Sequence, residues 1–261
     1  MCNFIHTNII KDVFDCREYK TSFSWDNYDD KDLEKAAKSI IDRGILAFFK
    51  EIGVENNVTS PKCFLIDPNS MMMLNMLINN EESNINNEDI FVNCNKSCEA
   101  IDVIHKKFTE KKLDFDFIKT YAKMQGLAFK KNVFINKTFA YPELGLHVLT
   151  HEIMHTLANE NAVKVLREGM NNDNRDEGIN EFFARVISLF LMKENQQYGL
   201  SANDEKIPFQ GVYASNIKED KYLCSIKDEI DKNMKEKIMM LGKFYFMGED
   251  NDVCKFYKTN K

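Results

Sequence analysis

The sequence predicts an α+β protein, with a small mixed sheet and helices first and a mainly helical part after it. Short apolar runs at 63–66, 90–93 and 133–135 are typical of buried strands, whereas apolar residues after about residue 142 recur at helical spacing. A chain of 261 residues with 44% hydrophobic residues is long and apolar enough to form a full core. We therefore expect one domain over 1–261, with an α+β lobe at 1–158 and a helical lobe at 159–261.

The first part of the chain shows alternating helical and strand patterns. Apolar spacing predicts a helix over 31–52 with Asp30 as its N-cap, although Gly44 weakens the pattern at its centre. The expected order after it is a strand at 63–66, a helix at 70–77, a polar loop at 79–89, a strand at 90–93, and helices at 97–112 and 115–124. A further strand is expected within 127–139, centred on 133–135.

Helices dominate the remainder. Pro142 suits the first turn of a helix, and an apolar stripe follows it at Leu146, Leu149, Ile153 and Leu157. A second helix is expected over 176–192 and, after a polar stretch at 195–208, one long helix over 218–241.

Composition excludes several classes of protein. The net charge of -6 argues against a nucleic-acid binder, which needs a basic face. No apolar run approaches the roughly 18 residues that a membrane span needs, and residues 1–20 lack the apolar stretch of a secretory signal. We expect synthesis in the cytoplasm, with any export using another signal. The seven cysteines are an odd number, which favours reduced thiols, and the oligomeric state stays open.

The strongest motif is His151-Glu152-Ile153-Met154-His155, an HExxH sequence on the expected apolar-striped helix. Residues four apart share one helix face, so the two imidazoles can bind one zinc ion. Glu152 is offset around the helix and can reach a zinc-bound water, from which it would take a proton and pass it to the leaving amine. The motif predicts one catalytic Zn²⁺ and a hydrolase.

A catalytic zinc ion needs a third protein ligand and an open position. No histidine follows His155, so this ligand is a carboxylate or comes from upstream. Glu177 and Glu181 share one face of the helix expected over 176–192, whose other residues are largely apolar. One acid can bind zinc and the other can accept a hydrogen bond from a ligand histidine.

Taken together, these residues resemble the gluzincin branch of the zincin metallopeptidases, which pairs HExxH with a glutamate on a later helix. Asp176-Glu177-Gly178, with Glu181 following, looks like the NEGxxE element of membrane-alanyl-type aminopeptidases and the NExxxD element of thermolysin. In those proteins the first glutamate binds zinc. Glu181-Phe182-Phe183-Ala184 looks instead like the EFFA element of anthrax lethal factor, in which that glutamate is the ligand.

The second alignment would place Arg185 in the supporting position, where it cannot accept a hydrogen bond from histidine. The resemblance therefore favours Glu177 as ligand and Glu181 as its support. It covers about 133–191, and the gap between His155 and either glutamate differs from the usual family spacing. It implies a zincin-like fold with the active-site cleft between the two lobes.

Other side chains are secondary candidates. His147 lies four residues before His151, but three histidines over two turns cannot all reach one metal, so we expect it at the cleft rim or in the core. The transition-state oxyanion also needs a stabilising group. We select Tyr213 for this role, with Tyr198 and Arg185 as rivals.

The sequence thus predicts a zinc-dependent endopeptidase that acts on a protein or peptide substrate. Without a GxMEN-like segment to anchor a substrate amine, an aminopeptidase is less favoured. A compact HExxH chain without a signal peptide suggests a bacterial toxin or injected effector. Two alternatives stay open, namely a catalytically inactive zincin-like binding or regulatory module and a non-peptidase hydrolase that uses the same site.

Overall fold

The computed structural model describes residues 4–15, 17–19, 29–55, 58–66, 71, 125–129, 131–136, 145–168, 173–194, 206–208, 212–230 and 233–259. The loop expected at 79–89 and the elements expected at 90–93, 97–112 and 115–124 lie outside these residues. The same holds for Pro142 and, apart from Met71, for the helix expected at 70–77.

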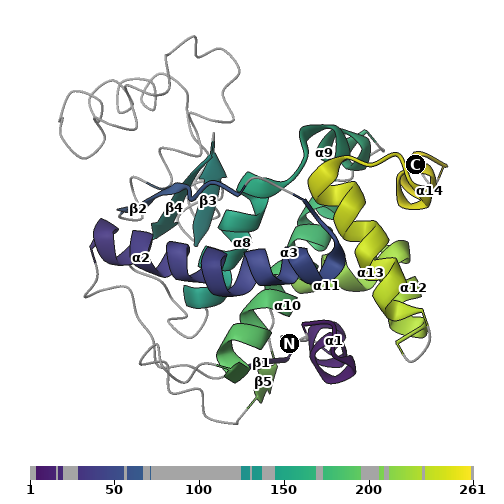
Figure 1. Ribbon diagram of the computed structural model, residues 1–261, viewed down its shortest axis with the longest axis horizontal. Coiled ribbons are helices and arrows are strands. Elements are labelled where there is room, and N and C mark those ends of the chain that lie inside the picture. The colour runs from purple at the N-terminus through teal and green to yellow at the C-terminus, as the bar shows by residue number, and fades with distance from the viewer. Residues whose placement is uncertain are drawn as a thin grey trace, which may run out of the picture.

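A small mixed sheet supports one side of the molecule (Figure 1). Its strand order is β2-β4-β3, with β2 (Lys62–Ile66) parallel to β4 (Asn132–Asn136) and β3 (Gly126–Phe129) antiparallel to β4. This sheet among helices confirms the α+β class and the strands predicted at 63–66 and 133–135. The sequence pattern predicted a single strand within 127–139, where the structure has the two strands β3 and β4. Lys131, at a φ of 64°, lies in the turn between them.

The helix predicted over 31–52 is three consecutive segments. They are α2 (Asp30–Ile40), the π-helical turn η2 (Ile41–Ile45) and α3 (Leu46–Ile52). The predicted N-cap is wrong by one residue, because Asp29 caps α2 through a reciprocal hydrogen-bonded box with Asp32. Asp30 instead accepts a hydrogen bond from the backbone N–H of Leu65 at 2.8 Å, which fastens α2 to the sheet.

Gly44 lies in the π-helical turn, where the sequence pattern was weakest. A Cβ atom at this position would lie 2.9 Å from side-chain carbons of Ile187 and Leu191. Glycine therefore permits a close approach between η2 and the long helix α10 (Asp173–Glu194).

Two helices occupy the centre of the fold. α8 (Gly145–Leu157) packs between the strands β3 and β4 and the helix α10. The helix predicted over 176–192 is confirmed as the middle of α10. Apart from Glu177, every residue of α10 from 176 to 192 is buried, so this helix forms the axis of the core.

The single helix predicted over 218–241 is wrong. The chain there forms α11 (Val212–Glu219), α12 (Lys221–Asp228) and α13 (Met234–Gly242). Asp220 interrupts the first pair, because its side chain accepts a hydrogen bond from the N–H of Leu223 and caps α12.

Further elements had no prediction. They are α1 (Thr7–Phe14), the antiparallel pair β1 (Arg17–Tyr19) and β5 (Lys206–Pro208), α9 (Glu160–Arg167), the π-helical turn η5 (Lys243–Met247) and α14 (Asp252–Thr259). The main hydrophobic core runs from Phe4 to Tyr257 and joins both ends of the described chain. Among the described segments, none of the helices has the length and apolar character that a membrane span requires.

The cysteines that the structure describes carry free thiols. These residues are Cys63, Cys224 and Cys254. Burial raises the pKa of the Cys63 thiol to about 12, which keeps it protonated and unreactive at neutral pH.

Candidate metal centre

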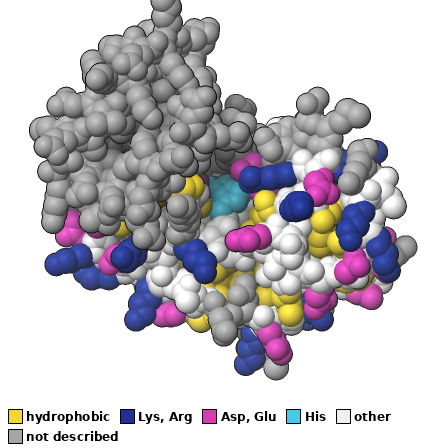
Figure 2. Space-filling view, turned by 90° about the horizontal axis from the view of Figure 1, so that it is seen from above, with side chains coloured by type: hydrophobic (Ala, Val, Ile, Leu, Met, Phe, Trp, Pro, Cys, Tyr) yellow, Lys and Arg dark blue, Asp and Glu magenta, His cyan; other side chains and the backbone are white. Residues whose placement is uncertain are grey.

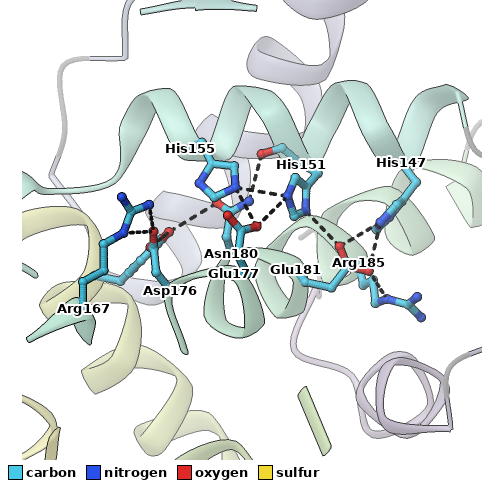
Figure 3. Close-up of polar contacts among 10 residues, drawn as sticks. His147, His151, His155, Arg167, Asp176, Glu177, Asn180, Glu181 and Arg185 are labelled. Atoms are coloured by element: carbon cyan, nitrogen blue, oxygen red, sulfur yellow. Dashed lines mark hydrogen bonds and ion pairs between the residues drawn. The ribbon is translucent and has the colours of Figure 1, made fainter. Parts of the chain in front are cut away.

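A histidine side chain is visible in a hollow on one face of the molecule (Figure 2). The HExxH residues lie on α8, and the two candidate glutamates lie on α10, which crosses below it (Figure 3). Helical spacing brings His151 and His155 to the face of α8 that meets α10. The polar groups of two otherwise buried helices therefore converge at one point.

Three potential ligand atoms form a compact triangle. Nε2 of His155 lies 3.1 Å from Nε2 of His151 and 3.1 Å from Oε2 of Glu177, and the same Glu177 oxygen lies 3.4 Å from Nε2 of His151. Ligand atoms bonded to one tetrahedral zinc ion are about 3.3–3.5 Å apart, given bond lengths of about 2.0–2.2 Å. Two imidazoles and one carboxylate are a donor set that suits a divalent metal, and their separations of 3.1–3.4 Å are close to these values.

Glu181 contacts the opposite side of the His151 ring. Its Oε2 lies 2.8 Å from Nδ1 of His151, and its Oε1 accepts a hydrogen bond from Nε of Arg185 at 2.7 Å. The carboxylate holds the proton on Nδ1, which leaves the Nε2 lone pair directed at His155 and Glu177. Glu181 therefore orients the imidazole.

The two carboxylates are held in their ionised forms. Burial alone would raise the pKa of Glu177, but the neighbouring rings of His155 and His151 lower it far below its ordinary value. Burial has the same tendency at Glu181, where His147 and Arg185 hold the pKa well below the usual range. Both side chains can thus accept hydrogen bonds or bind a cation at neutral pH.

The histidines respond in the opposite sense. Burial would lower the pKa of His151, but its contacts with Glu177 and Glu181 raise it well above the ordinary value. At His155 the lowering by burial is likewise outweighed by Glu177. The site therefore attracts positive charge, which a bound metal ion would also provide.

Glu152 lies between α8 and strand β3. Burial raises its pKa, and the His151 and His155 rings counteract this rise only in part. The backbone of Ala128 donates a hydrogen bond to its carboxylate. A Cβ atom on Gly126 would lie 2.6 Å from Cγ and 2.7 Å from Oε1 of Glu152, so the glycine provides the space that this side chain occupies.

A second polar network connects the two central helices to the C-terminal part. Asn180 donates a hydrogen bond to the backbone carbonyl of His151 at 2.9 Å. The hydroxyl of Tyr245 lies 2.9 Å from Oδ1 of Asp176 and 3.4 Å from Oδ1 of Asn180, and Arg167 contacts Asp176 at 2.6 Å. These contacts fix α10 relative to the motif helix.

Two overlapping groups of side chains could hold a metal ion. One consists of His151, His155 and Glu177, and the other of His147, His151 and Glu181. The side chains of His155 and Glu177 are 16% and 23% exposed, whereas those of His147 and Glu181 are 3% and 1% exposed. Only the first group is open to a substrate.

The predicted oxyanion-stabilising residues have different outcomes. Tyr213 lies in the first turn of α11, which packs against α10, but its side chain is not among those described. Tyr198 lies outside the described residues. Arg185 is fully buried and paired with Glu181 on the inner side of His151, so it cannot contact a substrate there.

Sequence reasoning missed several residues that shape the site. Gly126, Asn180 and Tyr245 are examples, and their roles depend on contacts between distant segments. Only Asn180 had a detectable signal, since it lies three residues after Glu177 and therefore on a neighbouring position of the same helix face. No protein-family model, curated protein or solved structure matches the chain.

Proposed function

We propose that the protein is a zinc-dependent endopeptidase that hydrolyses peptide bonds of a protein substrate. The observation that carries the proposal is the triangle formed by His151 Nε2, His155 Nε2 and Glu177 Oε2, with sides of 3.1, 3.1 and 3.4 Å. Its partly exposed side leaves room for the open position that a catalytic metal requires.

Zinc suits this donor set better than calcium or magnesium does. Calcium and magnesium prefer oxygen ligands, whereas two imidazole nitrogens and one carboxylate oxygen are typical of catalytic zinc. When bound, zinc would polarise a substrate carbonyl and lower the pKa of a coordinated water molecule. His151, His155 and Glu177 would hold the ion, and Glu181 would fix the His151 ring from behind.

Glu152 is the proposed general base and acid. A base that works near neutral pH needs a pKa above that of an ordinary carboxylate, and burial shifts the pKa of Glu152 in that direction. The carboxylate would accept a proton from the attacking water molecule and donate it to the leaving amine nitrogen. Gly126 and Ala128 of β3 define where this carboxylate lies.

The expected zincin-like fold and the role of the protein as a secreted or injected effector stay predictions from the sequence. The stabiliser of the oxyanion stays a prediction as well, with Tyr213 as the selected residue. The proposed ligand set of His151, His155 and Glu177 does not depend on any of these three predictions.

The first experiment measures the metal. We expect the purified protein to bind one equivalent of zinc by mass spectrometry of its metal content. Zinc at about 100 times its dissociation constant should stabilise the fold by about 2.7 kcal/mol, which raises Tm by about 5–10 °C. Only trace zinc after reconstitution, without a change in Tm, would contradict the proposal.

The second experiment separates metal binding from hydrolysis. Glu152→Gln should retain zinc and its stabilising effect but lose about 10²–10⁴-fold of the peptidase activity, because the amide cannot accept the proton. Glu160→Gln, an exposed change on α9, is the matched control. A zinc-loaded wild type that cleaves nothing in an unbiased peptide-library digest would favour the inactive binding module instead.

A further inference from the structure

We propose that His147 is a positioning residue of the metal centre, which together with Arg185 holds the Glu181 carboxylate against Nδ1 of His151. The inference rests on the metal-binding part of the proposed function and extends it to a residue outside the HExxH motif. It also assigns the inner group of His147, His151 and Glu181 a supporting role in place of a second metal site.

His147 lies one helical turn before His151 on α8, and its ring points toward α10 (Figure 3). Its Nε2 atom lies 3.1 Å from Oε1 and 3.0 Å from Oε2 of Glu181. Its Nδ1 atom lies 3.3 Å from the hydroxyl oxygen of Ser188. The ring therefore bridges the carboxylate and a second polar group on the same helix, which defines its orientation.

Glu181 is held from three directions. Nε2 of His147 contacts both of its oxygens, Nδ1 of His151 contacts Oε2, and Nε of Arg185 contacts Oε1 at 2.7 Å. A carboxylate that is 1% exposed needs such partners, because burial without them is costly. Together they prevent the carboxylate from rotating away from His151.

Arg185 also disfavours a metal ion at the inner group. Its side chain is fully buried, and its guanidinium keeps its positive charge at any physiological pH. A cation bound by Glu181 and His147 would lie beside that charge in a site from which water is excluded, where repulsion is strong. The same carboxylate can accept a hydrogen bond from Nδ1–H of His151, which brings no additional positive charge beside Arg185.

The consequence concerns the ligand strength of His151. A carboxylate on the far nitrogen of a metal-binding histidine fixes its tautomer and makes the ligand nitrogen more basic, and its loss typically lowers metal affinity about 10–100-fold. If His147 fixes Glu181, replacing His147 should remove part of the metal affinity that the contact between Glu181 and His151 provides. We expect His147→Phe to weaken metal binding by about 10-fold.

The test compares His147→Phe, His147→Gln and Ser188→Ala with the wild type. Zinc affinity is measured by competition with a chromophoric chelator, and the visible spectrum of the cobalt(II)-substituted protein reports on the ligand geometry. His147→Gln should recover most of the affinity and spectrum, because its amide can still donate to Glu181. Ser188→Ala removes only the contact at Nδ1 of His147 and keeps the partners of Glu181, so its effect on both readouts should be smaller than that of His147→Phe.

The results discriminate clearly. Loss of affinity with an altered cobalt spectrum in His147→Phe, recovery in His147→Gln and one metal equivalent throughout would support the positioning role. Unchanged affinity and spectrum in His147→Phe would overturn it, as would a second metal equivalent that disappears in this variant. Should His147→Phe fail to fold, His147→Asn, which is too short to reach Glu181, replaces it. A wild type that binds no metal would overturn the proposed function as well.

Discussion

The two sides of the His151 ring present the same residue types but differ in their surroundings. On the Nε2 side, His155 and Glu177 are partly exposed, at 16% and 23%. On the Nδ1 side, His147 and Glu181 are 3% and 1% exposed. Each side thus holds an imidazole and a carboxylate, yet only one side leaves space for a ligand from solution.

Charge reinforces this difference. Arg185 neutralises Glu181 on the inner side, so that carboxylate serves as a hydrogen-bond acceptor. Glu177 contacts only histidine nitrogens among its described ion-pair partners, and these nitrogens can bind a metal with it. Burial and a neighbouring cation can therefore assign different roles to two glutamates one helical turn apart.

The largest effect is expected from exchanging the two glutamates for glutamine separately. Loss of a hydrogen-bond partner of a metal-binding histidine lowers metal affinity by at most about 100-fold. Glu177→Gln removes a proposed ligand and should lower the affinity further, with little change in the Tm of the metal-free protein. Glu181→Gln should lower affinity about 10–100-fold and also destabilise the fold by about 3–5 kcal/mol, because it breaks the buried ion pair between Glu181 and Arg185. Chelator competition and calorimetry measure the two effects.

A reversed order of the affinities would contradict the roles proposed for Glu177 and Glu181. If Glu181→Gln loses the metal more completely than Glu177→Gln, Glu181 is the ligand, as in the alignment with anthrax lethal factor. The exposed change Glu160→Gln serves as the control for both variants.

An intermediate effect is expected from Gly126→Ala, which changes the partly exposed side of the site next to Glu152. The new Cβ atom would overlap Glu152 and displace its carboxylate. Because a displacement of about 1 Å can cost 10²-fold in rate, we expect peptidase activity to fall about 10–100-fold while zinc affinity stays near that of the wild type. Steady-state kinetics on a peptide substrate measure the loss.

Gly44→Ala is the matched control for this variant. Its Cβ atom would also meet side chains at 2.9 Å, but these belong to Ile187 and Leu191 in the core. This variant should lose stability and keep the kcat of its folded fraction. Equal kcat values for Gly126→Ala and the wild type would show that Glu152 does not depend on the space beside β3.

The smallest effect is expected from Tyr245→Phe, in the polar network that connects α10 to the C-terminal part of the chain. The change removes the hydroxyl that lies 2.9 Å from Asp176, while Arg167 still contacts that carboxylate. We expect a loss of about 1 kcal/mol in the free energy of unfolding and nearly unchanged zinc affinity. Urea denaturation with and without zinc measures both, and a large loss of affinity would place Tyr245 among the residues that control the ligands.

Much of the centre could be predicted from the sequence because its residues follow helical periodicity. His151 and His155 are one turn apart on α8, and Glu177 and Glu181 are one turn apart on α10, so their shared faces required no knowledge of the fold. The α+β class and the strands β2 and β4 followed from short apolar runs in the same way.

The other contacts depend on how distant segments pack. The position of Gly126 beside Glu152 joins two elements that no local pattern connects, and the same is true of Tyr245 and Asp176. The break at Asp220 illustrates a local limit. Its apolar neighbours continue the helical spacing, but its side chain caps a new helix and ends the continuous one.

The hydrogen bond from Asn180 to the carbonyl of His151 has a consequence for how such centres vary. Glu177 lies 22 residues after His155, but Asn180 holds α10 in a fixed register against the backbone of α8. The distance between the candidate ligand atoms therefore does not depend on the number of residues between His155 and Glu177. A chain with this hydrogen bond can lengthen or shorten that connection without moving the candidate ligand atoms.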